Sequence, residues 1–317
     1  MTDKSAEVVD ALIFGGGPAG LSAALNLARA RATVMVIDAG RPRNAATLRS
    51  HGFLTRDGIS PLELRKLARA EIAEYPTVRV LDRTSVTTLS EVYGEDGVRF
   101  LATFRGRRSG GPSTVSARSV LIATGLRETL PAIPSLRGFY GITLFSCAAC
   151  DAWELQDRPL ALIGETPDIP VRARLIARWT DDLTVFTNGA NVVDTAEESE
   201  LAASGIVVER RRIDDLEGDR GVISAVRLSD GSRIRIDGGF IRPRWDPALD
   251  FLDGIAVGRD SEGHLLVDRS GRTSVPGLYA AGDAAAPGPQ QLIVAAGQGA
   301  RAAAVLIHDI VGVRTAH

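Results

Sequence analysis

The chain holds only two cysteines, Cys147 and Cys150, and they stand three positions apart in the stretch FSCAACDAWE. Two thiols at this spacing can cycle between dithiol and disulfide, which carries two electrons, or they can bind a metal ion. A zinc site needs four ligands, but there is no third cysteine, and the four histidines are scattered without metal-ligand spacing. We therefore expect redox chemistry and no metal, with a pair of inert buried cysteines as the plain alternative.

The composition limits the class of protein. At 317 residues and 33.6 kDa the chain exceeds the usual size of one hydrophobic core, so two domains are expected. A formal net charge of -2 and a pI of about 6.1 give no electrostatic basis for binding nucleic acid or anionic membranes. The N-terminus lacks signal-peptide features, and no apolar stretch approaches the roughly 20 residues of a membrane span. The expected location is the cytoplasm, where a C-x-x-C is more often redox-active or metal-binding than structural.

Residues 9–38 have the pattern of a nucleotide-binding unit. They read as an apolar strand, a glycine turn, a helix rich in alanine and leucine, and a second strand that ends in an acid. Gly15, Gly17 and Gly20 match G-x-G-x-x-G, whose glycines permit a tight turn, close approach of a pyrophosphate and close packing of helix on strand. The helix N-terminus then faces the phosphates. Asp38 follows Gly20 by 18 residues, where an acid can accept hydrogen bonds from ribose hydroxyls.

A second glycine-containing motif lies near the C-terminus. The stretch GLYAAGD reads as a short strand that delivers Asp283, and a helix of small residues with Gly297 and Gly299 follows it. With these motifs the chain resembles the pyridine nucleotide-disulfide oxidoreductases of the low-molecular-weight thioredoxin reductase type, over essentially its whole length. The segment SVLIATG, which ends at Gly125, is similar to the strand that closes the FAD domain in that family.

The resemblance implies that the cofactor is FAD. In the family the first glycine motif binds the ADP half, and the Gly-Asp near the C-terminus binds the ribitol. Gln290 and Gln291 match a pair whose second member lies by the flavin pyrimidine ring, and Asn44 could hydrogen-bond the flavin. The residues expected to bind FAD are Gly15, Gly17, Pro18, Ala19, Gly20, Asp38, Asn44, Gly282, Asp283, Gln290 and Gln291.

The resemblance also implies roles around the cysteines. In the family the C-x-x-C follows the FAD-domain strand, so Cys150 would face the flavin and Cys147 would exchange with substrate. Asp151 matches the acid that serves proton transfer in thioredoxin reductases, although some related dithiol oxidases carry histidine there. His51 lies in a loop that passes near the flavin ring in the family. It is a second candidate base, with an ordinary hydrogen-bonded loop histidine as its alternative.

A second unit of strand, turn, helix and strand begins at PLALIGETPDIPV, but its turn has lost glycines. Aligned to G-x-G-x-x-G, Gly164 takes the first position, while Thr166 and Ile169 take the other two. Thr166 adds a Cβ where the backbone should touch pyrophosphate. Pro170 removes an N–H donor near the helix start, and Glu165 brings negative charge toward phosphate. This unit is predicted to bind a dinucleotide poorly.

Nothing after the second strand replaces what the turn has lost. NADPH recognition uses arginine for the 2′-phosphate and NADH recognition uses an acid, whereas this chain has TNGAN at that place. Arg172 and Arg174 could substitute from the helix, although helix arginines more often form a solvated face. We expect a degenerate NAD(P)H-like domain.

FAD and a redox-active cysteine pair without a hydride source favour oxidation of a dithiol. The pattern is similar to the thioredoxin-reductase-like dithiol oxidases that close disulfides in natural products such as gliotoxin, holomycin and romidepsin. The expected substrate is a small-molecule dithiol, and the expected electron acceptor is O2, which leaves as hydrogen peroxide. Two alternatives stay open: a thioredoxin reductase-like enzyme with NADPH or another donor such as ferredoxin, and a flavin-bound redox sensor.

The expected fold is α/β and thioredoxin reductase-like, with two Rossmann-like nucleotide-binding domains, the second inserted into the first. Residues 1–125 and 241–317 are expected to form the FAD-binding domain. Residues 126–240 are expected to form the degenerate NAD(P)H-like domain that carries the C-x-x-C pair. The resemblance also implies a homodimer.

Overall fold

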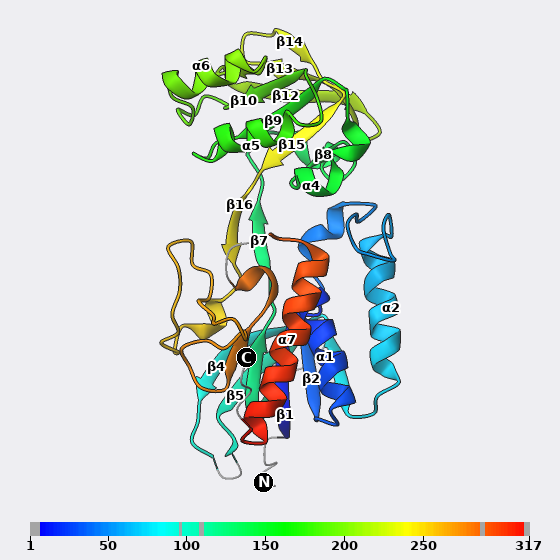
Figure 1. Cartoon of the computed structure of the whole chain (residues 1–317), viewed down its shortest axis with the longest axis vertical. Helices are drawn as coiled ribbons and strands as arrows, with labels where there is room; N and C mark the ends of the chain where they lie inside the picture. The colour runs from blue at the N-terminus through cyan, green and yellow to red at the C-terminus, as the bar shows by residue number, and fades with distance from the viewer. Residues whose placement is uncertain (1–6, 95–96, 108–110, 286–288, 314–317) are drawn as a thin grey trace.

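The computed structural model describes residues 7–94, 97–107, 111–285 and 289–313. Figure 1 shows two α/β bodies stacked along the long axis and joined by a narrow two-stranded ribbon. The mixed α/β architecture with parallel sheets agrees with the fold predicted from the sequence. Residues 1–6, the start of the N-terminal stretch that lacks signal-peptide features, lie outside the described residues.

The lower domain in Figure 1 is built on a seven-stranded sheet. Its strands lie in the order β3, β2, β1, β6, β5 and β4, and β17 pairs with the last residues of β6. Strands β1, β2, β3, β6 and β17 are parallel, whereas β4, β5 and β6 form an antiparallel meander. The bounds are β1 Val8–Phe14, β2 Val34–Asp38, β3 Val78–Asp82, β4 Thr84–Glu91, β5 Phe100–Gly106, β6 Ser113–Ile122 and β17 Leu278–Ala280.

Helices α1 (Pro18–Arg29), α2 (Pro61–Ala73) and α7 (Leu292–Ile310) belong to the same domain. The predicted strand, turn, helix and strand over residues 9–38 are therefore confirmed as β1, α1 and β2. α7 is the predicted helix of small residues, and those residues let it pack closely on α1. A Cβ at Gly299 would collide with the carbonyl oxygen of Ala19. This contact joins the two ends of the chain.

The upper domain contains a five-stranded parallel sheet in the order β11, β10, β9, β15 and β8, and a three-stranded antiparallel sheet, β12 to β14. The predicted second unit is confirmed as β9, α5 and β10. The strands are β8 Leu144–Phe145, β9 Leu160–Gly164, β10 Leu183–Phe186, β11 Val207–Glu209, β12 Ile213–Asp219, β13 Val222–Leu228, β14 Arg233–Arg235 and β15 Gly238–Arg242. The helices are α3 Leu136–Phe139, α4 Ala148–Asp151, α5 Ile169–Ile176 and α6 Thr195–Ala203.

Two short antiparallel strands, β7 (Leu126–Thr129) and β16 (Arg244–Pro247), connect the domains. Figure 1 shows them as the ribbon between the two bodies. The chain leaves the lower sheet after β6, runs up through β7, completes the upper domain and returns through β16. Each domain has hydrophobic clusters of its own, which is the condition for two separate cores.

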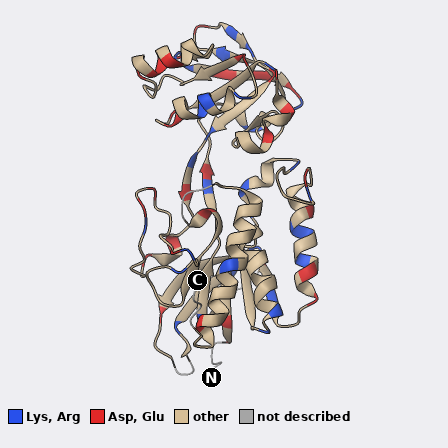
Figure 2. Ribbon diagram, in the orientation of Figure 1, with Lys and Arg blue, Asp and Glu red and all other residues tan. Residues whose placement is uncertain are grey.

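Charged side chains of both signs are interspersed over both domains in Figure 2, and no single-sign face dominates that view. This distribution agrees with the near-neutral net charge. Among the described residues, no helix has the length and apolar character needed to cross a membrane.

Candidate active site

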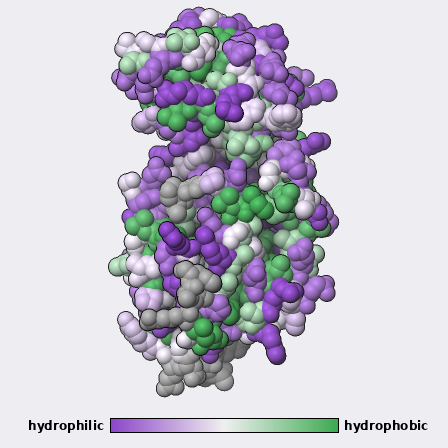
Figure 3. Space-filling model, in the orientation of Figure 1, coloured by the Kyte–Doolittle hydropathy of each residue, from purple (hydrophilic) through white to green (hydrophobic). Residues whose placement is uncertain are grey.

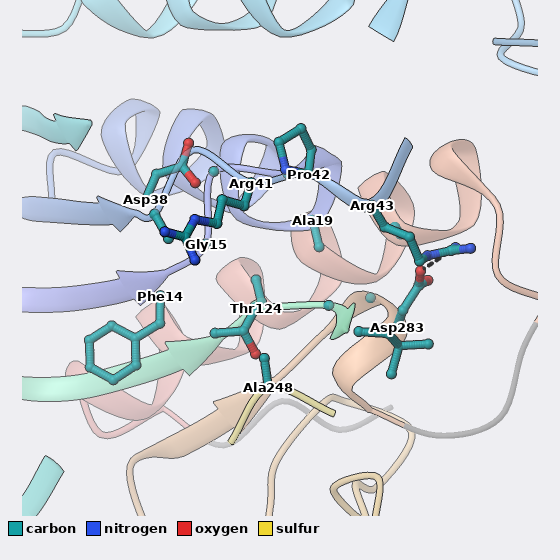
Figure 4. A pocket seen from close by; sticks show the side chains of 18 of the residues that line it. Phe14, Gly15, Ala19, Asp38, Arg41, Pro42, Arg43, Thr124, Ala248 and Asp283 are labelled. Atoms are coloured by element: carbon teal, nitrogen blue, oxygen red, sulfur yellow. Dashed lines mark hydrogen bonds and ion pairs between the residues drawn. The ribbon is translucent and has the colours of Figure 1, made fainter. Parts of the chain in front are cut away.

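A cavity of about 440 Å³ runs through the lower domain along the carboxyl ends of its parallel strands. This edge is where open α/β sheets bind ligands. The cavity contacts the glycine turn, both strands that flank it, the start of α7 and the end of β17. Figure 4 shows the turn and Asp38 on one side of it and Asp283 on the other. Every residue expected to bind FAD, except Gly20, lines this cavity.

The first glycine turn has the geometry that its three glycines were predicted to supply. Gly15 has a φ of +109°, and a Cβ there would collide with the carbonyl oxygen of Ala123. A Cβ at Gly20 would collide with the carbonyl oxygen of Gly15, so this position is closed by backbone. Gly17 differs, because a Cβ there would meet no described atom within 4 Å. Gly17 thus opens the N-terminus of α1 toward the cavity, as an anion site requires.

Asp38 stands at the end of β2, where the sequence placed an acid for ribose hydroxyls. Its Oδ2 accepts hydrogen bonds of 2.6 Å from both Arg65 and Arg69 of α2, and its Oδ1 accepts one of 3.0 Å from the Gly40 N–H. A carboxylate oxygen has two acceptor sites, so Oδ1 keeps one for a ligand hydroxyl. A Cβ at Gly16 would lie 2.5 Å from Oδ2, so Gly16 must also be glycine.

Asp283 lies on the far side of the cavity and is ion-paired with Arg43 at 2.7 Å (Figure 4). Arg43 comes from the loop after β2, directly before Asn44. Gln290 and Gln291 stand at the start of α7, and the Gln291 side chain does not cap that helix. The predicted residues from both ends of the chain therefore meet around one cavity.

Buried polar atoms without partners test whether this cavity fits FAD. Within the described part of the chain, Thr124 Oγ1 and Arg65 Nε are buried and make no hydrogen bond, and both residues line the cavity. An unpaired buried polar atom costs about 1–3 kcal/mol, so it is usually matched by a ligand or water. A long polar ligand that lies between Asp38 and Gln291 would satisfy them. The donor set and the glycine turn fit a dinucleotide such as FAD.

Cys147 and Cys150 form a disulfide, with Cα atoms 5.3 Å apart. Cys147 is the N-cap of α4, a single helical turn that carries Cys150. A cavity of about 100 Å³ opens beside the disulfide. Its wall includes Asn44, Gln290 and Gln291, which also line the large cavity. The disulfide therefore faces the end of the dinucleotide cavity at which the sequence placed the flavin ring.

Asp151 follows Cys150 and lines the disulfide cavity. Burial raises the pKa of its carboxyl to about 7, and the charge of His51 opposes that rise while the charge of Glu154 adds to it. A carboxyl with a pKa near neutral pH can exchange protons with a thiol in both directions. The geometry supports a proton-transfer role for this residue.

His51 lines the same cavity from the opposite domain. Its Nδ1 is 3.4 Å from Asp57 Oδ2, and its Nε2 is 3.6 Å from Glu154 Oε1. The loop around it is closed by hydrogen bonds from Ser50 N–H to the Ile59 carbonyl and from Gly52 N–H to Asp57 Oδ1. His51 and Asp151 are therefore both at the disulfide, although they come from different domains.

The turn between β9 and α5 is filled by side chains of the protein. Ile169 fills the place of the third glycine and is fully buried, so that a Cβ at Gly164 would collide with its Cδ1. Asp168, the N-cap of α5, accepts hydrogen bonds from Arg172 Nε at 2.6 Å and Arg242 Nε at 2.8 Å. Thr166 Oγ1 donates to the same carboxylate at 2.6 Å.

These contacts place a carboxylate of the protein near the N-terminal end of α5, where a phosphate would bind in the first unit. The arginines and the Thr166 hydroxyl lower the pKa of Asp168 to about 2 against the opposing effect of burial. Arg172 is thus already paired, and Arg174 is paired with Glu200 at 3.1 Å. Neither the large cavity nor the cavity beside the disulfide is lined by any of residues 164–170.

Sequence reasoning missed several residues of the site. Arg43 reaches across the cavity to Asp283 and also lies 5.4 Å from the ring centre of Trp245 in β16. The position of Arg43 next to Asn44 was the available signal. Asp57 and Glu154 have no sequence signal, because only folding of the loop brings Asp57 to His51 and only the approach of the two domains brings Glu154 there. No group of three or more potential metal ligands occurs among the described residues.

The fold and the site together are those of an oxidoreductase. Residues 9–299 match the pyridine nucleotide-disulphide oxidoreductase family, and the chain belongs to that family. Members of the thioredoxin reductase branch are flavoproteins, and this chain is thioredoxin reductase-like.

Individual relatives agree with this assignment over nearly their whole length. The structure of a putative thioredoxin reductase TrxB from Bacillus anthracis is 36% identical, covers 96% of this chain and 99% of that one, and has a TM-score of 0.87. The structure of HlmI is 33% identical, covers 98% and 95%, and has a TM-score of 0.88. Thioredoxin reductase tcpT from Claviceps purpurea is 29% identical, with 88% of each chain covered.

Proposed function

We propose that this oxidoreductase binds FAD and oxidises a small-molecule dithiol to a disulfide, with O2 as the electron acceptor. The observation that carries the proposal is the juxtaposition of a disulfide and a dinucleotide cavity that share Asn44, Gln290 and Gln291 as lining residues. A thiol can reach the disulfide through the smaller cavity. The second nucleotide turn, in contrast, has an internal carboxylate where a cofactor phosphate would bind.

In the proposed reaction one substrate thiolate attacks Cys147, the Cys147–Cys150 bond breaks, and Cys150 leaves as a thiolate. The second substrate thiolate then attacks the substrate sulfur of the mixed disulfide, and Cys147 leaves. The substrate loses two electrons and the cysteine pair gains them. Asp151 accepts a thiol proton, because its raised pKa lets it hold a proton near neutral pH.

The chain's own groups would hold the cofactor as follows. Gly17 and the N-terminus of α1 would face the pyrophosphate, Asp38 the adenosine ribose and Asp283 the ribitol. Asn44 and Gln291 would contact the flavin ring beside the disulfide. Bound FAD supplies an acceptor for the two electrons of the cysteine pair and a route from there to O2, which leaves as hydrogen peroxide.

An anaerobic reductant test decides the proposal. The purified yellow protein is expected to lose its flavin absorbance when dithiothreitol is added, with a rate that rises through about pH 7 as Asp151 loses its proton. Admission of air is expected to restore the colour and release hydrogen peroxide. Protein without flavin, or flavin that a dithiol does not bleach, would overturn the proposal. Bleaching without hydrogen peroxide formation in air would indicate a reductase that exchanges electrons with a partner other than O2.

We further propose a homodimer and a cytoplasmic location. Leu48, Leu54, Leu62 and Ile293 are exposed apolar residues of the lower domain. Figure 3 shows hydrophobic surface over the start of α7 and the neighbouring loop. A second copy would remove such surface from water. Sedimentation is expected to give twice the chain mass at micromolar concentration, and a monomer there would contradict the proposal.

A further inference from the structure

His51 lies at the disulfide with an acid on each side of its ring, and the proposed reaction does not yet use it. Its Nδ1 faces Asp57 of its own loop, and its Nε2 faces Glu154 of the 3-10 turn after α4. Asp151 of α4 acts on it electrostatically, and Arg43 and Arg49 line the same cavity. One carboxylate from each domain thus lies beside each ring nitrogen.

Asp151 and His51 are both partly buried, whereas the two acids that flank His51 are exposed. The His51 side chain is 17% exposed, and the Glu154 and Asp57 side chains are 46% and 69% exposed. The intervening cavity of about 100 Å³ exceeds several times the roughly 15 Å³ that one water needs. The cavity that Asp151 and His51 both line therefore has room for water, and the acids beside His51 are open to solvent.

The two thiol steps require a path by which protons move away from the disulfide. Two substrate S–H bonds break and one substrate S–S bond forms, while the enzyme disulfide opens and takes both electrons. In this half of the cycle Cys147 and Cys150 leave as thiolates, so two protons leave the substrate thiols, and two are taken up again when O2 becomes hydrogen peroxide. One carboxyl holds only one proton, so Asp151 must release the first before it can accept the second.

We infer that His51, oriented by Asp57 and Glu154, carries protons from Asp151 to solvent between the two thiol steps. This inference rests on the proposed dithiol oxidation. It makes His51 a proton carrier beside Asp151 rather than a replacement for it, and it makes Asp57 and Glu154 positioning residues. Histidine suits this task because both ring nitrogens exchange protons near neutral pH.

The experiment follows disulfide opening directly. Anaerobic holoenzyme is mixed with dithiothreitol and quenched with a thiol-alkylating reagent. Because the chain has only two cysteines, the alkylated thiols report on this pair alone. His51→Ala is expected to slow thiol formation about 10- to 100-fold at pH 7, and added imidazole is expected to restore it. Asp57→Asn and Glu154→Gln are expected to slow it by a smaller factor, roughly 3- to 10-fold.

Matched controls separate this role from a structural one. Asp219→Asn and Glu200→Gln make the same chemical changes at exposed carboxylates far along the chain, and they are expected to react at the wild-type rate. Asp151→Asn is expected to stay slow in imidazole, because the exogenous base replaces the carrier and not the buried acceptor. If His51→Ala loses FAD, His51→Gln keeps a polar side chain between the two acids and serves as the test.

The outcomes distinguish this inference from the proposed function. If wild-type protein forms no thiols with dithiothreitol, the proposed dithiol oxidation is wrong. If wild-type protein reacts while the His51 variant reacts equally fast, the carrier role is wrong and the proposed function stands. A slow His51 variant that imidazole does not restore would likewise overturn the carrier role and leave a structural one.

Discussion

The two strand–turn–helix units of this chain have the same fold and opposite chemistry. In the first, the N-terminus of α1 opens into a large cavity at Gly17, where a Cβ would meet no described atom within 4 Å. In the second, the turn before α5 is filled by the buried Ile169 side chain and by the Asp168 carboxylate. A βαβ unit is therefore a binding site only if its turn leaves backbone N–H groups free for the ligand.

The second turn also shows how a protein can occupy its own anion site. Asp168 brings a negative charge to the start of α5, and Arg172 and Arg242 compensate it. Arg172 and Arg242 also lie against the ring of Trp245, at 5.5 and 4.3 Å, together with Arg43 of the other domain. Arg172, a candidate phosphate ligand in the sequence, is instead paired with Asp168 and lies against a tryptophan of the connecting ribbon.

The largest expected effect is the loss of activity when either cysteine of the second domain is replaced. Cys147→Ser and Cys150→Ser are each expected to abolish dithiol oxidation, a loss of more than about 1,000-fold, because the relay needs both sulfurs. Both variants are expected to keep FAD, since neither cysteine lines the large cavity. Turnover assays and flavin absorbance of the purified variants provide the measurement. Normal turnover by either variant would contradict the cysteine relay.

The next effect compares the two turns directly. NADPH and NADH are expected to bleach the flavin at least about 100-fold more slowly than dithiothreitol, because the second turn offers no free anion site. Stopped-flow absorbance under anaerobic conditions measures both rates. Thr166→Gly is expected to leave NADPH slow, since Ile169 and Asp168 still occupy the turn. Fast bleaching by micromolar NADPH would contradict this prediction and show that the second domain binds the cofactor.

A matched pair in the first turn separates ligand contact from packing. Gly17→Ala is expected to weaken FAD binding by about 10- to 100-fold while the apoprotein keeps its stability within about 0.5 kcal/mol, because the new Cβ enters the cavity. Gly20→Ala is expected to destabilise the apoprotein by about 2–4 kcal/mol, because its Cβ meets the Gly15 carbonyl. Flavin titration and denaturant unfolding of the apoproteins measure the two effects. Equal destabilisation by both changes would refute the distinction.

The smallest effect concerns the internal carboxylate of the second turn. The paired arginines hold the pKa of Asp168 at about 2, below its unfolded value, so its stabilising effect is present above about pH 4 and is lost toward pH 2. Asp168→Asn is therefore expected to lower the free energy of unfolding at pH 7 by about 1 kcal/mol, after allowance for solvent screening of this partly exposed group. Urea unfolding at pH 7 and pH 3 measures it. A difference that grows on acidification would have the wrong sign.

Much of the molecule could be predicted from the chain because the deciding interactions are local. The glycine spacing of residues 15–20 dictates a turn, and the apolar runs on either side dictate parallel strands. The Cys147–Cys150 pair limits the chemistry to two electrons. The loss of glycine at Thr166 and Ile169 was also readable, because a side chain at the second position hinders approach of a pyrophosphate and one at the third hinders close packing of helix on strand.

Other features depend on residues that are far apart in sequence and meet only after folding. The sequence indicated that Asp38, Asp283 and Gln291 belong to a cofactor site, but only the sheet order β2–β1–β6–β17 brings them to one cavity. The pairing of Asp168 with Arg242 likewise requires β15 to lie beside β9. Local sequence preferences carry no information on such contacts, because each charged side chain by itself is well solvated by water and does not select its partner.

The two candidate bases, Asp151 and His51, also combine features set by the sequence with features set by the tertiary structure. The sequence by itself determined that Asp151 follows the second cysteine and that His51 lies in the loop after the first nucleotide unit. Only the tertiary structure decided that both line one cavity, that burial raises the pKa of Asp151 to about 7, and that Glu154 reaches His51 across the domain boundary. Burial and charge proximity are properties of the packed chain, so they are absent from the order of its residues.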